Sequence, residues 1–196
     1  MGILTALGVS TGAIFAAEMG DKTQLVAMSL ATRYRVATVL LGITAATVAV
    51  HGFSVLIAEV LNLAIPTDWV TLLCGLAFLG FGVWTFYGDE LTERDEERAA
   101  SRRIRSGLLT VAVVFFVAEL GDKTMLATVT VGAQYGWLPV WIGSTVGMVL
   151  ADAIAIGLGA LLGKKLPQRA IQNCAAGLFL LAGGVMVFRG VAQLAA

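Results

Sequence analysis

The chain has 196 residues, of which 58% are hydrophobic and only 13% charged, and its mean hydropathy is +0.88. About a quarter of the residues of a soluble domain are charged, so this composition excludes an ordinary soluble domain, and a net charge of zero gives no sign of nucleic-acid binding. Apolar runs of about 18 residues or more predict helices that cross a membrane. We therefore expect an all-α, multi-pass membrane protein in contact with a lipid bilayer, with no nucleic-acid partner.

Six membrane-spanning helices fit the apolar segments in chain order. They cover residues 4–31, 36–61, 70–87, 107–132, 138–162 and 171–190. Pro66, Pro139 and Pro167 fall in loops or at helix starts, where proline is tolerated. The predicted spans therefore have no proline in their interiors.

A short acidic motif occurs in both halves of the chain. Glu18-Met19-Gly20-Asp21-Lys22-Thr23 returns 101 positions later as Glu119-Leu120-Gly121-Asp122-Lys123-Thr124. Each half holds three predicted helices, and because an odd number of helices reverses the chain direction, the second half should be inverted relative to the first. We predict a first three-helix repeat at 1–88, a charged linker at 89–106 and a second, inverted repeat at 107–196.

The basic residues predict the orientation in the membrane. The odd-numbered connections between predicted helices carry nearly all of the Lys and Arg outside the motifs, and the opposite side carries only Arg189. Cytoplasmic loops are enriched in Lys and Arg. Both termini are therefore expected outside, with the 89–106 linker in the cytoplasm, and in a bacterium the location would be the inner, or cell, membrane.

The acids of the two motifs are the candidate metal ligands: Glu18, Asp21, Glu119 and Asp122. Residues three apart share a helix face, and inverted repeats bring such faces together near the membrane midplane. An ionised acid there costs about 3 kcal/mol, so four acids need compensation by a cation, by protons or by Lys22 and Lys123. All-oxygen ligands suit Ca²⁺, Mg²⁺ or Mn²⁺, and a bound metal would expel protons, which is the linkage that an antiporter requires.

Other polar residues near the motifs are candidates for supporting roles. The candidate additional ligands are Thr23, Thr124 and Gln24. Gly20 and Gly121 allow either close helix packing or a break in the backbone that offers carbonyl groups. His51 aligns with Asp152 at the same offset of 101, and this pair of titratable groups predicts a proton relay or a second cation site. The alternative for His51 is a hydrogen-bonded packing role.

Three other interpretations of the motifs stay open. The pairs Asp21–Lys22 and Asp122–Lys123 could be neutral ion pairs that only fix helix packing. Asp21 and Asp122 each follow a glycine, as in the G-x-G-D motif of intramembrane aspartyl proteases, although a glutamate replaces the first glycine of that motif here. The third alternative is an exporter of another cationic solute on a similar scaffold.

The duplicated E-x-G-D-[KR]-[ST] motif, in a small six-helix chain with a charged central segment, resembles one family over essentially the whole chain. It is similar to the calcium/manganese cation–proton antiporters, which include MneA-type bacterial manganese exporters and Golgi and chloroplast relatives. The resemblance implies a transporter, not an enzyme, that exports Mn²⁺, or alternatively Ca²⁺, from the cytoplasm in exchange for protons. It places the ion on Glu18, Asp21, Glu119 and Asp122, requires no cofactor besides the transported ion, and leaves a homo-oligomer open.

Overall fold

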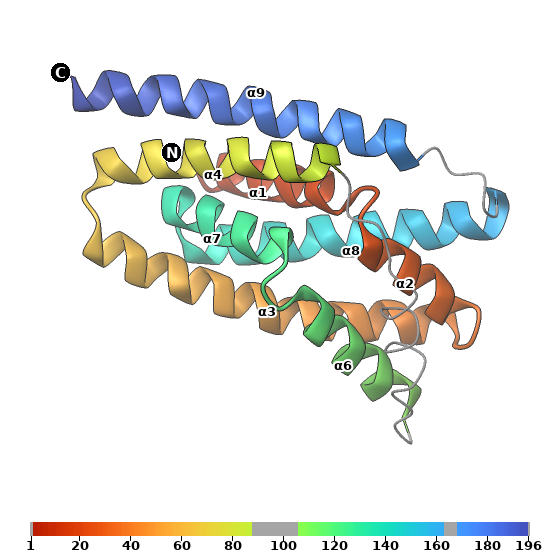
Figure 1. Cartoon of the computed structure of the whole chain (residues 1–196). Coiled ribbons are helices and arrows are strands. Elements are labelled where there is room, and N and C mark those ends of the chain that lie inside the picture. The colour runs from red at the N-terminus through yellow and green to blue at the C-terminus, as the bar shows by residue number, and fades with distance from the viewer. Residues whose placement is uncertain (1, 88–105, 163–167, 196) are drawn as a thin grey trace.

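The computed structural model describes residues 2–87, 106–162 and 168–195, and every regular element within these ranges is an α-helix (Figure 1). The predicted all-α class is therefore confirmed. The charged linker predicted at 89–106 lies, apart from Ser106, outside the described residues. The helices are α1 (Ile3–Glu18), α2 (Lys22–Ala31), α3 (Val36–Ala64), α4 (Thr67–Tyr87), α6 (Gly107–Glu119), α7 (Lys123–Tyr135), α8 (Trp137–Leu162) and α9 (Gln168–Leu194).

Four of the described helices, α3, α4, α8 and α9, are each long and apolar enough to cross a membrane. A fifth candidate span consists of α1 and α2 together, which are bent by 79° at the break between them. The span predicted over 4–31 is therefore not one continuous helix, because the chain leaves the helical conformation after Glu18. The predicted span at 107–132 is divided in the same way, after Glu119.

Each break depends on a glycine of the repeated motif. Gly20 has φ +78° and Gly121 has φ +79°, a left-handed conformation that glycine adopts without the steric penalty of a Cβ atom. Asp21 and Asp122 follow in extended conformation and immediately precede α2 and α7. In each motif the glutamate therefore lies before the break and the aspartate after it. The sequence had suggested that the two acids share one face of a continuous helix.

Small residues allow the helices to pack closely around these breaks. The most extensive helix contacts join α4 to α9, α1 to α8, and α3 to α6. A Cβ atom added at Gly143 of α8 would lie 2.8 Å from the Leu7 carbonyl oxygen of α1, and one at Gly42 of α3 would lie 2.7 Å from Val111 Cβ of α6. Close approach at small residues is typical of helix packing in membranes.

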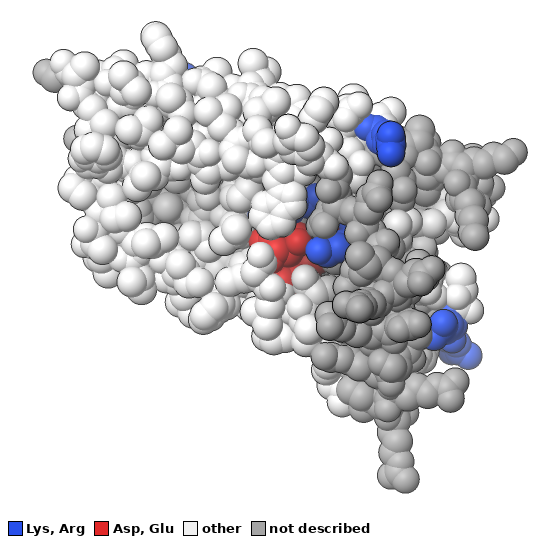
Figure 2. All heavy atoms as spheres, in the orientation of Figure 1, with Lys and Arg blue, Asp and Glu red and all other residues white. Residues whose placement is uncertain are grey.

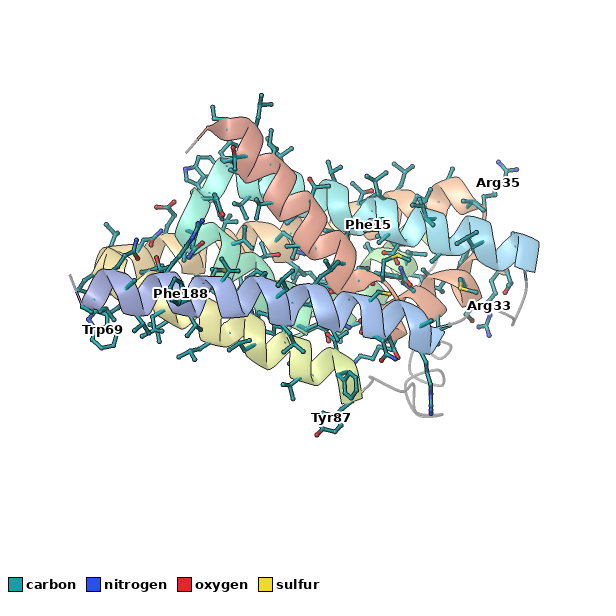
Figure 3. The ribbon with its side chains drawn as sticks, turned by 90° about the horizontal axis from the view of Figure 1, so that it is seen from above. Phe15, Arg33, Arg35, Trp69, Tyr87 and Phe188 are labelled. Carbon is teal, nitrogen blue, oxygen red and sulfur yellow. The ribbon has the colours of Figure 1, made fainter. Side chains whose placement is uncertain are left out.

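Apolar side chains cover much of the outer surface. Phe53, Leu56, Tyr87 and Phe188 are each more than half exposed, which is more apolar surface than a soluble monomer normally leaves in water. Figure 3 shows Arg33 and Arg35 at one end of the long helices and Trp69 at the opposite end. Apolar sides with charged and aromatic residues at the ends fit a protein that crosses a lipid bilayer several times.

Candidate cation site

The acids of both motifs are buried where the helices break. Glu18, Asp21 and Glu119 have no exposed surface, and 5% of Asp122 is exposed. The side chain of Lys22 is 28% exposed. Figure 2 shows acidic and basic atoms together at one place on this face of the molecule, so the acidic region reaches the surface at a narrow point.

The two motifs form one electrostatic cluster. Glu18 interacts with Glu119 and Asp21, and Glu119 interacts with Asp122. Asp152 of α8 is buried and lies within electrostatic range of Glu18 and Asp21. The four predicted ligands therefore belong to one electrostatic group, and Asp152, which the sequence indicated only as a member of a separate relay or second site, interacts with the same group.

The lysines of the motifs form ion pairs across the repeats. Lys123 Nζ lies 2.6 Å from Asp21 Oδ1, and the two side chains are 2% and 0% exposed. Lys22 Nζ lies 3.9 Å from Asp122 Oδ1. Each of these lysines therefore pairs with the aspartate of the other motif. These ion pairs link the two halves of the chain, whereas the sequence suggested pairs between neighbours within one motif.

Threonine hydroxyls hold one oxygen of each glutamate. Thr23 Oγ1 donates a hydrogen bond to Glu18 Oε1 over 2.5 Å, and it also lies 3.1 Å from Asp21 Oδ2. Thr124 Oγ1 donates to Glu119 Oε2 over 2.5 Å. Two of the three predicted additional ligands are thus already in contact with the predicted carboxylate ligands.

Several buried carboxylate oxygens accept no hydrogen bond from the described residues. They are Glu18 Oε2, Glu119 Oε1 and both side-chain oxygens of Asp152. A buried charged acceptor without a partner is costly, so each of these oxygens needs a cation or a proton. Oxygen donors of this kind match the preference of Ca²⁺, Mg²⁺ and Mn²⁺.

These acids are nevertheless too widely spaced to bind one metal ion together. Among the residues that the structure describes, no three His, Cys, Asp or Glu side chains are close enough together to hold one metal ion. The donor atoms are therefore of the right chemical kind for a divalent ion, whereas their present spacing is wider than a finished coordination shell requires.

The two breaks are capped by residues that differ between the repeats. The Gly20 N–H donates to Gln24 Oε1 over 2.9 Å, and Gln24 Nε2 donates to the Ala151 carbonyl over 3.3 Å. At the second break, the Gly121 N–H lies 3.2 Å from Met125 Sδ. The Gln24 side chain thus caps the first break through its amide oxygen and ties it through its amide nitrogen to α8, next to Asp152.

One residue at the first break was missed by the sequence analysis. Gln172 Nε2, on α9, donates to the Gly20 carbonyl oxygen over 2.7 Å. The only sequence signal was an amide side chain in the first turns of an apolar helix. His51, which the sequence did single out, is fully buried in α3, and its two ring nitrogens have no hydrogen-bond partner among the described residues.

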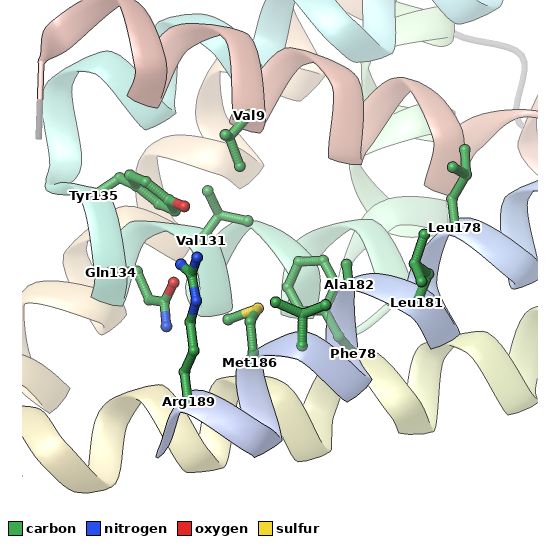
Figure 4. Close-up of a pocket in the computed structure, with 11 residues that line it drawn as sticks. Val9, Phe78, Val131, Gln134, Tyr135, Leu178, Leu181, Ala182, Met186 and Arg189 are labelled. Atoms are coloured by element: carbon green, nitrogen blue, oxygen red, sulfur yellow. The ribbon is translucent and has the colours of Figure 1, made fainter. Parts of the chain in front are cut away.

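A pocket of about 410 Å³ lies apart from these residues. It is lined mainly by apolar side chains of α1, α4, α7 and α9, and Figure 4 shows Arg189 reaching toward Gln134 and Tyr135 at one end. The lining includes no acid of either motif. The pocket therefore has the wrong chemistry for a divalent cation, and the candidate site remains the acidic cluster at the breaks.

The family of the chain follows from its sequence similarity to known proteins. A family model described as "Divalent cation/proton antiporter GDT1" matches residues 6–93 and again residues 107–194. The chain belongs to this family, whose members are transporters and not enzymes, and with its long apolar helices it is a multi-pass membrane protein.

Individual relatives extend from bacteria to chloroplasts. The chain is 35% identical over 182 residues to the "Putative manganese exporter" of Vibrio cholerae, with 91% of this chain and 88% of that protein covered. It is 32% identical to GDT1-like protein 2, chloroplastic, of rice, over 91% of this chain and 59% of that protein. It is 29% identical to the GDT1-like protein sll0615 of Synechocystis, covering 91% and 95%. No solved structure matches the chain.

Proposed function

We propose that this protein exports a divalent cation from the cytoplasm in exchange for protons, with Mn²⁺ as its principal ion and Ca²⁺ as the alternative. The observation that carries the proposal is the buried carboxylate cluster at the two helix breaks, in which oxygens of Glu18 and Glu119 have no hydrogen-bond partner among the described residues. The name of the Vibrio cholerae relative supports Mn²⁺ as the first ion to test.

The cation is held by acids from both repeats in this proposal. The ligands are Glu18, Asp21, Glu119 and Asp122, with the hydroxyls of Thr23 and Thr124 close by. Because the acids are more widely spaced than a coordination shell requires, ion binding would draw the two breaks together. The extended residues at each break can adjust more easily than the interior of a helix, in which backbone hydrogen bonds hold every residue.

Charge balance explains why protons would move in the opposite direction. The cluster contains five carboxylates when Asp152 is included, and two lysines offset only part of this charge. Buried negative charge requires a cation or protons. A divalent ion that binds would release protons from the cluster, and protons that return on the other side would release the ion.

The proposed architecture is six membrane spans in two inverted three-helix repeats. The first span of each repeat is broken, as α1–α2 and as α6–α7, at glycines with the same positive φ. The two separate matches of the family model, at 6–93 and 107–194, support the division at 1–88, 89–106 and 107–196. In this arrangement both termini lie outside and the linker lies in the cytoplasm. Inverted repeats with broken helices at the substrate site are typical of secondary transporters.

Transport in proteoliposomes tests the proposal. Vesicles that contain the protein and a pH-sensitive dye receive Mn²⁺, Ca²⁺ or Mg²⁺ outside, and metal uptake and proton release are followed together. We expect Mn²⁺ uptake with matching proton efflux, lost in Glu18→Gln and in Glu119→Gln. Glu59→Gln is the matched control, because Glu59 is a partly buried glutamate of α3 outside both motifs.

Other outcomes distinguish the alternatives. Metal flux without proton movement would retain the carboxylate site and exclude the exchange. No flux with any divalent ion would favour another cationic solute as the cargo. Full activity in both glutamine variants would contradict the assignment of the site.

A further inference from the structure

Lys123 lies deeper in the cluster than any other basic residue that the structure describes there. Its side chain is only 2% exposed, and its Nζ is 2.6 Å from Asp21 Oδ1. It also interacts electrostatically with Glu18 and Asp122. Buried lysines are rare and are normally paired, and this one is surrounded by the carboxylates that the proposed function assigns to the transported ion.

We propose that the Lys123 ammonium is a tethered cation that competes with the transported ion for the carboxylates, and that a divalent ion binds by moving Lys123 away from Asp21. This inference rests on the proposed function, because it names the competitor within the same site. It makes Lys123 a residue that sets affinity and ion selectivity, in addition to its part in holding the repeats together.

The contacts of Asp21 explain the competition. Asp21 Oδ1 is paired with Lys123 Nζ, and Asp21 Oδ2 lies 3.1 Å from the Thr23 hydroxyl. A metal ion that takes Asp21 as a ligand would therefore lie beside the ammonium group, and two positive charges at that separation repel strongly in a buried site. Four rotatable bonds in the lysine side chain give it the freedom to withdraw.

The competition also favours divalent over monovalent ions. A monovalent ion would replace one positive charge near Asp21 with another and would gain little electrostatic energy. A divalent ion brings one more charge to a cluster with an excess of carboxylates. Lys123 would thus weaken the binding of Na⁺ and K⁺. It would also lower the affinity for the divalent ion to a value that permits release.

The equivalent lysine of the first repeat provides a matched control. Lys22 Nζ is 3.9 Å from Asp122 Oδ1, and its side chain is 28% exposed. Water screens an exposed ion pair far more than a buried one. Removal of the Lys22 charge should therefore change divalent-ion binding much less than removal of the Lys123 charge, although the two residues occupy the same motif position.

Metal binding to the purified full-length protein in detergent tests the inference, with MnCl₂ titrated into wild type, Lys123→Gln and Lys22→Gln by calorimetry. We expect Lys123→Gln to bind Mn²⁺ roughly tenfold more tightly or better, and Lys22→Gln to change the affinity in the same direction by a smaller factor. NaCl should weaken Mn²⁺ binding more in Lys123→Gln than in wild type, because the built-in competitor is gone. Lys123→Met, which is similar in length and uncharged, repeats the measurement if Lys123→Gln does not fold.

The outcomes separate this inference from the function on which it rests. If a folded Lys123 variant binds Mn²⁺ with equal or lower affinity than wild type, Lys123 is not a competitor and the inference is overturned. A lysine that only positions Asp21 would give this result, because its loss would disorder a ligand. If wild type binds no divalent ion in the titration and transports none, the proposed function itself fails.

Discussion

Lys123 and Asp21 belong to different halves of the chain, yet Lys123 Nζ lies 2.6 Å from Asp21 Oδ1 with both side chains buried. The pair therefore joins the second helix break to the first. Asp21 is one of the proposed ligands and Lys123 is the neighbour of another. In the proposed transporter, a change at the cation site would therefore act directly on the contact between the two halves of the chain.

A double-mutant cycle measures the strength of this pair. Asp21→Asn leaves a buried ammonium group without its carboxylate, and the loss of one partner of a buried pair costs about 3–5 kcal/mol. We expect the combined variant Asp21→Asn/Lys123→Gln to be more stable than Asp21→Asn, because no charge of the pair is left uncompensated. Unfolding in detergent, followed by tryptophan fluorescence, gives the free energies. Purely additive effects would show that the pair makes no stabilising contact.

The close packing of α1 against α8 predicts a second effect on stability. A Cβ atom at Gly143 would lie 2.8 Å from the Leu7 carbonyl oxygen, so Gly143→Ala should push the helices apart and lower the free energy of unfolding by about 1–3 kcal/mol. At Gly157 of the same helix, nothing lies within 4 Å of an added Cβ atom. Gly157→Ala should leave stability unchanged or raise it by up to about 1 kcal/mol. Equal destabilisation by both substitutions would argue against close packing at Gly143.

The sequence predicted the helical segments well, because long apolar runs and the positions of proline are local features. It also identified the acids that meet at the breaks, because the motif is repeated within the chain. The geometry within each motif could not be predicted from the sequence. Gly20 is compatible with a continuous helix or with a positive φ, and only the packed structure shows which of the two occurs.

The contacts between the halves depend on residues that are distant in the sequence. Lys123 pairs with Asp21 and not with its neighbour Asp122, and Gln172 bonds to the Gly20 carbonyl. Both contacts follow from how α7 and α9 lie against the first repeat. The 101-residue offset revealed which positions are equivalent, but it carried no information on which of them touch.

Thr23 and Thr124 should both be needed for full transport. Each donates a hydrogen bond to a motif glutamate, Glu18 or Glu119, over 2.5 Å. Hydrogen bonds to charged groups contribute about 1.5–3 kcal/mol, so loss of either hydroxyl should lower the apparent Mn²⁺ affinity in vesicles roughly tenfold or more. We expect this result for Thr23→Val and Thr124→Val, whereas the serine variants keep the hydroxyl and most of the activity.

A third valine variant controls for the loss of a buried hydroxyl. Thr130 Oγ1 donates to the Leu126 carbonyl of its own helix, over 2.9 Å, and Thr130 lies outside both motifs. Thr130→Val should therefore transport Mn²⁺ almost as wild type does. If it loses as much affinity as Thr124→Val, the effect comes from helix α7 in general and not from the contact with Glu119.

Asp152 and His51 are equivalent by position, but the structure predicts unequal roles. Asp152 lies within electrostatic range of Glu18 and Asp21, and its two oxygens accept no hydrogen bond from the described residues. Asp152→Asn removes one carboxylate from the cluster, so fewer protons should leave for each Mn²⁺ that enters. His51→Leu should retain the wild-type ratio, because the buried ring has no hydrogen bond within the described residues to lose. Simultaneous dye and metal measurements in vesicles give the ratio. If the number of protons released per Mn²⁺ changes in His51→Leu but not in Asp152→Asn, the proton pathway includes His51 of α3 and not Asp152 of α8.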